Sequence, residues 1–362
     1  MPWLPSRGDS SGARMSIRPE RLAAASRLLQ NDLLEALALA SDAIADDLAE
    51  RLHMVAWDRE EQIGAAQRRL IALRELRFDS YGGEPVRVRE LEAQPLEALE
   101  LVWRALRTGR AVHAESEAAA CPAMYRIFTQ LSELLGRDAL EVSEPGVFDH
   151  EHSDWPLLGV HPRRERVALV QADADRELAA YLLARACLRR TGFDPRVVHR
   201  VVVVGPAERL ERNLRRLWVG ARMGPVDDEQ AFAGPVDESR AERFLEVEAA
   251  WRACAEVDSL CPGARLERPD SSPHVYLAPA LVRADPEESS SLPEPFGPML
   301  VLHPVADQAR AEALLEQLSA PDHARLRFGI KPRNVVLREG DRQIHGALLV
   351  ERLPPGLPEP RP

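Results

Sequence analysis

The chain has 362 residues, enough for two domains that each bury a hydrophobic core. Its 47 basic and 58 acidic residues give a formal net charge of −11. This balance argues against nucleic acid and anionic membranes as partners, because phosphate binding needs clustered cations. No run of apolar residues is long enough to cross a bilayer, so no membrane partner is expected either.

The two ends of the chain are expected to be disordered. Residues 1–17 are rich in Pro, Gly and Ser, the segment from Leu353 onward is rich in proline, and the start lacks the apolar core of a secretory signal. The cysteines show no CxxC pair and no metal-binding spacing, and they are too few for a disulfide scaffold. We therefore expect a cytoplasmic protein with reduced thiols. The four cysteines are Cys121, Cys187, Cys254 and Cys261.

Amphipathic helices are predicted from Pro19 to Leu76, where leucines recur at helical spacing until Gly82 and Gly83 end the pattern. From Pro85 onward, short apolar runs alternate with helical stretches, which is typical of an α/β fold. The predicted helices are 96–106, 122–135, 176–190, 206–217, 238–255 and 306–318. The predicted strands are 111–114, 166–171, 200–204, 275–282 and 299–303, followed by apolar runs at 334–337 and 347–350 that return to a sheet edge or serve dimer contacts.

Five stretches, in matching order, resemble conserved segments of the aldehyde dehydrogenase superfamily. Together they cover roughly residues 85–330. The stretches are 105–112 (similar to "ALAAGNAVV"), 170–175 ("IVFADADL"), 192–201 ("GQxCxAxxRV"), 217–220 with 234–236 ("LxVGDP" and "GPL"), and 294–300 ("EExFGPVL").

The resemblance implies an α/β fold in two lobes. Residues 18–165 would form the N-terminal helices and a truncated, Rossmann-like lobe of the dinucleotide-binding type. Residues 166–330 would form the α/β lobe that is catalytic in the family. Residues 331–362 would supply a C-terminal strand segment and a proline-rich tail.

The family's reaction needs a thiolate that attacks the aldehyde, a nicotinamide that accepts hydride and a carboxylate that activates water. In register, the nucleophile position holds Pro195, which has neither a nucleophile nor a backbone N–H. Cys187 lies eight residues earlier, inside a predicted helix, and is expected to be a core residue. The general-base position falls on His161, in a basic turn, and Gln94 is the only amide near the oxyanion position.

The cofactor positions have also changed. The lysine that contacts the adenosine ribose in the family falls on Glu115, or on Ala114 with a one-residue slip. The segment between Val142 and His161 is acidic and too short for the usual strand, pyrophosphate-binding turn and helix. Glu294 matches the glutamate that holds the nicotinamide ribose. No cofactor is therefore expected, and NAD or NADP would be needed if the chain were active.

Residues 149–154 form a D-H-E-H-x-D run, which could supply ligands for a divalent metal. A solvated acidic loop is the favoured interpretation, because ligands so closely spaced rarely converge without a fixed turn, and no metal site is predicted.

Three hypotheses follow. The first is a catalytically inactive aldehyde-dehydrogenase-like protein that scaffolds, regulates or pairs with an active homologue, as a homodimer or hetero-oligomer. The second is an active oxidoreductase whose thiol has moved to Cys187 or Cys121. The third is an unrelated α/β ligand-binding protein.

Overall fold

The structure is a computed structural model, and its residues group into two compact units that are described separately. Unit 1 comprises residues 1–47 and 62–160, and unit 2 comprises residues 48–61 and 161–362. Residues 48–61, which were predicted to belong to the first lobe, therefore group with the second. The structure describes residues 34–75, 84–89, 95–116, 121–144, 154–158, 166–194, 197–267, 274–318, 325–328, 336–339 and 342–345.

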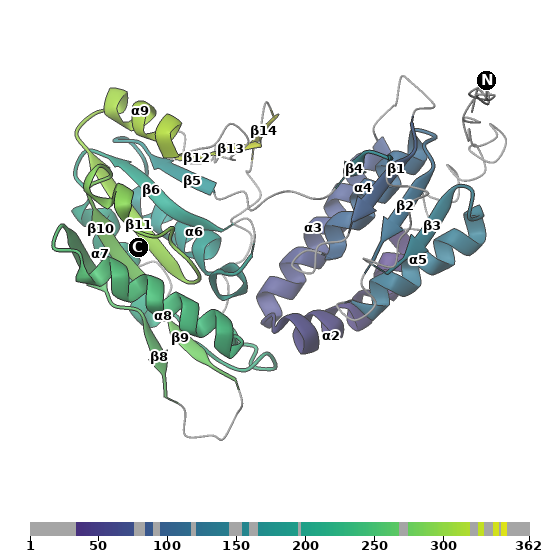
Figure 1. Ribbon diagram of the computed structural model, residues 1–362, viewed down its shortest axis with the longest axis horizontal. Helices are drawn as coiled ribbons and strands as arrows, with labels where there is room; N and C mark the ends of the chain where they lie inside the picture. Colours follow the sequence, from purple (N-terminus) through teal and green to yellow (C-terminus); the bar gives the residue numbers. More distant parts are fainter. Residues whose placement is uncertain are drawn as a thin grey trace, which may run out of the picture. The chain divides into compact units, whose positions relative to one another are not determined.

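Unit 1 is built on a four-stranded parallel sheet in the order β3-β2-β1-β4 (Figure 1). Its strands are β1 (Val86–Arg89), β2 (Val112–Glu115), β3 (Leu140–Ser143) and β4 (Leu157–Leu158). β4 pairs with β1 on the side opposite to β2. A parallel sheet with helices is what the predicted α/β fold class requires.

Helices complete unit 1. The amphipathic α4 (Pro95–Arg107) buries Leu99 and Trp103, and α5 (Pro122–Leu135) begins with proline in its first turn, where the missing N–H costs nothing. The N–H of Ala123 donates to Asp47 Oδ2 at 2.7 Å, and this carboxylate comes from the helix α2 (Ser41–Leu52). The long α3 (Ala56–Glu75) follows α2, and residues 48–52 of α2 and 56–61 of α3 group with unit 2.

Unit 2 is built on an eight-stranded sheet in the order β14-β13-β12-β5-β6-β11-β10-β7. The pairs between β12, β5, β6, β11 and β10 are parallel, whereas β7, β13 and β14 are antiparallel to their neighbours. The bounds are β5 (Arg166–Val170), β6 (Val198–Val204), β7 (Val257–Cys261), β10 (Ala280–Ala284), β11 (Met299–Val305), β12 (Arg325–Phe328), β13 (Val336–Glu339) and β14 (Arg342–His345). The described C-terminal residues thus return to a sheet edge. β13 overlaps the predicted run 334–337, β14 was not predicted, and the predicted run 347–350 lies outside the described residues.

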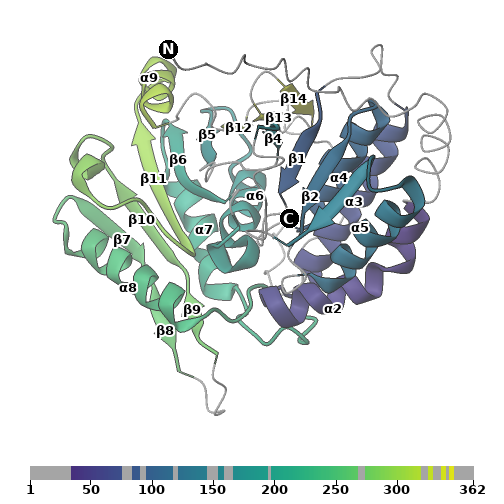
Figure 2. The same ribbon diagram turned by 45° about the vertical axis from the view of Figure 1, so that its right-hand side comes forward.

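Helices cover both faces of this sheet, as the rotated view shows (Figure 2). Val201 and Leu302 face α6 (Arg176–Leu188) and α7 (Glu208–Gly220) in one core. Val202 and Val301 point to the opposite face, where α9 (Gln308–Leu318) and α8 (Glu238–Ala253) pack. A parallel sheet buried on both faces explains why its strands are nearly continuous apolar runs.

Proline breaks one predicted strand. The run 275–282 was predicted as a single strand, but Pro279 separates β9 (Tyr276–Ala278) from β10. Proline cannot donate to a strand ladder, so the two halves pair differently. β9 pairs with β8 (Ala264–Leu266) in a separate two-stranded sheet, whereas β10 joins the eight-stranded sheet. The prediction of one strand was wrong.

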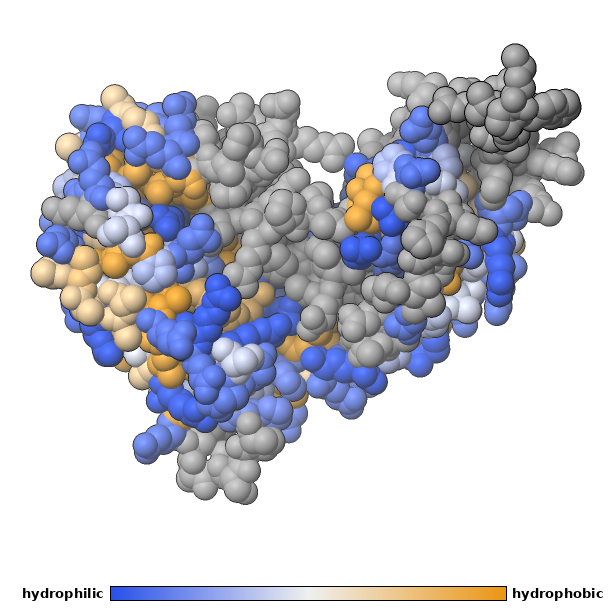
Figure 3. All heavy atoms as spheres, in the orientation of Figure 1, coloured by the Kyte–Doolittle hydropathy of each residue, from blue (hydrophilic) through white to orange (hydrophobic). Residues whose placement is uncertain are grey.

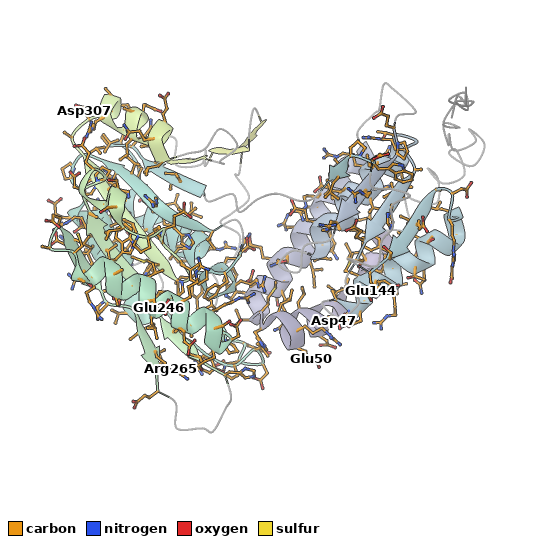
Figure 4. The ribbon with its side chains drawn as sticks, viewed as in Figure 1. Asp47, Glu50, Glu144, Glu246, Arg265 and Asp307 are labelled. Carbon is orange, nitrogen blue, oxygen red and sulfur yellow. The ribbon has the colours of Figure 1, made fainter. Side chains whose placement is uncertain are left out.

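The surface of unit 2 mixes polar and apolar residues on the face drawn in Figure 3. Among the described residues of unit 2, the large hydrophobic side chains that are exposed are Val219 and Leu266, which are far apart in sequence. Asp307, labelled in Figure 4, caps the start of α9. Its Oδ1 accepts a hydrogen bond of 2.9 Å from the backbone N–H of Arg310. No helix in the described part of the chain is long and apolar enough to cross a membrane.

Candidate functional site

The turn after α6 is the centre of the candidate site, because it leads into the position that corresponds to the family's nucleophile. It begins with the 3-10 segment η2 (Arg189–Gly192), in which Arg190 and Thr191 have φ values of 49° and 54°. Two successive residues with side chains in left-handed backbone are uncommon, since each costs on the order of 1 kcal/mol. Contacts from elsewhere must therefore hold the turn in place.

Glycines from distant segments provide these contacts. Gly192 has a φ of 83°, and a Cβ at this position would lie 2.3 Å from the backbone carbon of Gly297. Thr191 Oγ1 donates to the carbonyl oxygen of Gly234 and accepts from its N–H, both at 3.0 Å. His199 Nε2 lies 3.0 Å from the Gly297 carbonyl oxygen. Three of the stretches that resemble the family, around residues 192, 234 and 297, therefore meet at one turn.

Acidic residues from another segment support the turn. The N–H of Arg190 donates to Asp58 Oδ2 at 2.9 Å. Arg189 Nη2 lies 2.6 Å from Glu61 Oε1, and Arg185 Nη2 lies 2.5 Å from Glu61 Oε2. Asp58 and Glu61 belong to the segment 48–61, so this segment of unit 2 fixes the conformation of the turn.

The two carboxyl groups differ in their electrostatic environment. Burial raises the pKa of Asp58 to about 6, and Arg189 offsets this only in part, since its Nε is 3.9 Å from the carboxylate. Although burial acts to raise the pKa of Glu61, its two arginine partners lower it below the usual value. The ionised form of Glu61 thus stabilises the fold, whereas that of Asp58 destabilises it.

Pro195 and Arg196 lie outside the described residues, as do His161, Gln94 and the run from Asp149 to Ser153. Among the described residues, no group of three or more His, Cys, Asp or Glu side chains could hold a metal ion.

Cys187 lies in the core of unit 2 and is not accessible to a substrate. It is fully buried on α6, within the cluster that includes Leu183 and Leu188. Burial raises the pKa of its thiol far above the usual value, so the thiolate is not populated at neutral pH. The sequence prediction of a core cysteine agrees with this position.

The other cysteines differ in exposure. Cys121 is fully buried in unit 1, with its Sγ 3.8 Å from Asp47 Oδ2. Cys261 is buried, and burial raises its pKa as well. Cys254 is partly exposed at the end of α8, and its Sγ lies 3.0 Å from Glu256 Oε2. Cys254 is therefore the most accessible of the four thiols.

Glu115, at the position of the family's ribose-binding lysine, is a buried acid in a cross-strand ion pair. Its carboxylate lies 2.5 Å from Arg89 Nε and 3.7 Å from Arg87 Nη1, both on the neighbouring strand β1. The register of the parallel pair places Arg89 beside Glu115. Ala114, the alternative position, is buried. These side chains hold the sheet together, and they do not fit the role of a lysine that contacts a nucleotide.

Glu294 is the one described residue that keeps the family's identity at a cofactor position. It is exposed and lies in the loop before β11, two residues from the buried Phe296. The position is compatible with a ribose contact, but a single exposed glutamate does not define a nucleotide site.

Comparison with known proteins identifies the fold. No family model matches the chain, and no curated protein matches it. Many solved structures do, among them methylmalonate-semialdehyde dehydrogenase (DddC) from Oceanimonas doudoroffii, at a TM-score of 0.70 and 17% identity over 87% of this chain and 74% of that chain. A NAD-dependent benzaldehyde dehydrogenase from Corynebacterium glutamicum matches with a TM-score of 0.68 and 15% identity, over 85% of this chain and 75% of that chain.

A third similar structure is a mutant of 1-pyrroline-5-carboxylate dehydrogenase from Thermus thermophilus, with a TM-score of 0.65 and 14% identity, over 87% of this chain and 70% of that chain. The chain thus has the aldehyde dehydrogenase fold. The predicted fold class and the predicted resemblance are confirmed, and the hypothesis of an unrelated α/β fold is wrong.

Thiol reactivity should follow exposure. We expect Cys254 to react with an electrophilic thiol reagent in the native protein at neutral pH, and Cys187 to react more slowly by a factor on the order of a hundred or more, because its exposure requires local or global unfolding. Mass spectrometry of timed, quenched samples measures both rates in one experiment. In urea, where both thiols are exposed, the difference should disappear.

Proposed function

We propose that this chain is a catalytically inactive protein with the aldehyde dehydrogenase fold, and that it acts as a scaffold, a regulator or a binding partner. The observation that carries the proposal is that the candidate turn has its supporting contacts but no accessible nucleophile. Glycine contacts around Gly192 and a hydrogen bond to Asp58 hold the turn in place, whereas the nucleophile position is Pro195 and the nearest thiol in sequence, Cys187, is buried.

The nucleotide side supports the same conclusion. Glu115 is committed to a buried ion pair with Arg87 and Arg89, where the family has a lysine for the ribose. The segment 144–156 joins β3 to β4 without a helix among its described residues, so the described part of this segment offers no helix N-terminus for a pyrophosphate. We propose that no nucleotide cofactor is bound. Two similar structures are described as a NAD-dependent dehydrogenase and as a putative dehydrogenase complexed with NAD, so NAD would be the first candidate if the chain were active.

The alternative is an active oxidoreductase that uses Cys187 or Cys121. Both thiols are fully buried, which counts against this alternative, because a thiol must be accessible and ionised to attack an aldehyde.

We also propose that the chain binds a partner. A cytoplasmic homodimer, or a hetero-oligomer with an active homologue, would suit a chain that keeps a fold without its chemistry.

A turnover assay tests the proposal. Purified protein should give no reduction of NAD or NADP above the blank with aliphatic or aromatic aldehydes. Cys187→Ser and Cys121→Ser are the matched variants. If the wild type turned over an aldehyde and either variant abolished the reaction while remaining folded, the protein would be an enzyme with a relocated thiol, and the proposal would fail.

A further inference from the structure

Asp58, at the start of α3, carries a fully buried carboxyl group with few hydrogen bonds. Its Oδ2 accepts a hydrogen bond of 2.9 Å from the backbone N–H of Arg190 in the candidate turn. Among the described residues no donor reaches Oδ1, and the Nε of Arg189, at 3.9 Å from it, is beyond hydrogen-bond distance. An ionised carboxylate buried with a single hydrogen bond is costly, so this environment favours the neutral acid.

The charged groups that act on Asp58 favour the neutral acid as well. The guanidinium group of Arg189 is bound to Glu61, with Nη2 and Oε1 2.6 Å apart, and Arg185 holds the other oxygen of Glu61 at 2.5 Å. Asp194, which is buried after η2, adds its negative charge to that of Glu61. Arg189 therefore offsets the burial of Asp58 only in part, and the pKa of Asp58 is about 6.

The segment that carries Asp58 is held on both sides. The indole Nε1 of Trp57 donates to the carbonyl oxygen of Phe232 at 2.8 Å, and the two rings are stacked with centroids 5.1 Å apart. The Nη1 of Arg59 donates to the carbonyl oxygen of Val226 at 3.0 Å. When Asp58 ionises, its own segment is therefore not free to carry the carboxylate to water.

The candidate turn, on the other side of the carboxyl group, is easier to displace. Arg190 and Thr191 have φ values of 49° and 54°, and each left-handed residue costs on the order of 1 kcal/mol. Opening at Arg190 releases part of this strain and lets water reach Asp58. The hydrogen bond between Arg190 and Asp58 thus joins a buried acid to the strained part of the turn.

We propose that Asp58 and the candidate turn form a proton-sensitive switch, in which the turn stays closed while Asp58 is neutral and opens more often once Asp58 has given its proton to water. The closed turn is favoured at low pH, because its pKa of about 6 exceeds the ordinary value of 3.8 that exposure restores. This preference is fully present below about pH 4 and is lost as the pH rises to about 6. The switch needs neither a nucleophile nor a cofactor, so it and the proposed inactivity can fail independently.

Hydrogen exchange of the full chain, read at single amides by mass spectrometry, tests the inference. We expect the protection of the Arg190 amide, corrected for the intrinsic exchange rate, to fall about tenfold between pH 5 and pH 8, as pKa values of about 6 and 3.8 require. Low concentrations of urea should not change this exchange, because a local opening exposes little surface. The amide of Leu214, fully buried on α7, is the reference for global unfolding, and its exchange should rise with urea.

Two variants of α3 complete the experiment. Asp58→Asn should remove the pH dependence at Arg190, whereas Glu60→Gln, at an exposed position of the same helix, should keep it. Circular dichroism checks that both variants are folded, and the wild-type comparison decides the matter if Asp58→Asn is not. The proposal is overturned if the wild-type Arg190 amide is equally protected at both pH values, if Asp58→Asn shows the same fall, or if Arg190 exchanges only together with Leu214 in urea-dependent unfolding.

Discussion

Replacing Gly192 by alanine should destabilise the protein by more than about 3 kcal/mol, because a new Cβ would meet backbone that cannot move aside. The Cβ would lie 2.3–2.4 Å from Gly297 and from the nitrogen of Pro298, and Gly192 has a φ of 83°. Equilibrium unfolding in urea, followed by circular dichroism, measures the loss. A variant that fails to accumulate in folded form would meet the same expectation.

Gly205→Ala is the control for backbone strain without a clash. Gly205 also has a positive φ, of 75°, but no atom lies within 4 Å of its added Cβ. The free energy of unfolding of Gly205→Ala should fall by only about 1 kcal/mol. Equal losses in the two variants would show that the close approach of residues 192 and 297 does not exist in solution.

Replacing Asp58 by asparagine should stabilise the protein above pH 7 and have little effect near pH 4. The native carboxyl has a pKa of about 6 against an ordinary value of 3.8, so the native state binds its proton more tightly than the unfolded state does. Stability from this group is therefore present at low pH and is lost as the pH rises from about 4 to 6. Two units of pKa correspond to roughly 3 kcal/mol, and asparagine keeps an acceptor for the Arg190 N–H.

Glu61→Gln is the matched variant, and it should change the stability in the opposite direction. The pKa of Glu61 is lowered by Arg189 and Arg185 against the effect of burial, so removing its charge should destabilise the protein at neutral pH. Urea unfolding of both variants and of the wild type at several pH values gives the comparison. If Asp58→Asn were less stable than the wild type at pH 8, the ion pair with Arg189 would outweigh the burial of the carboxylate.

Much of unit 2 could be predicted from the sequence, because a sheet covered on both faces leaves continuous apolar runs. The start of β11 at Met299 and the beginning of α6 at Arg176 coincide with the predicted bounds. The short strand β1 was not predicted, since Val86–Arg89 alternates apolar and charged residues over only four positions. The ion pair of Glu115 could not be found for the same reason, because its partners lie on that strand.

The candidate site was predictable only in part. The resemblance identified the stretches around Gly192, Gly234 and Glu294 but not the contacts among them, which depend on three-dimensional packing. The predicted helix 176–190 ends at Leu188, since Arg190 and Thr191 adopt left-handed backbone without glycine. Asp58 gave no signal in sequence, because an acidic residue in an amphipathic helix is usually solvated.

Cofactor binding is the measurement that tests the central claim most directly, because it needs no knowledge of the substrate. We expect millimolar NAD and NADP to leave the unfolding temperature of the full chain unchanged. The reason is that an acid, Glu115, stands in an ion pair where the family has its ribose-binding lysine. A cofactor that bound with a dissociation constant a hundredfold below its concentration would stabilise the protein by about 2.7 kcal/mol. A saturable rise in the unfolding temperature, abolished by Glu294→Ala, would contradict the account.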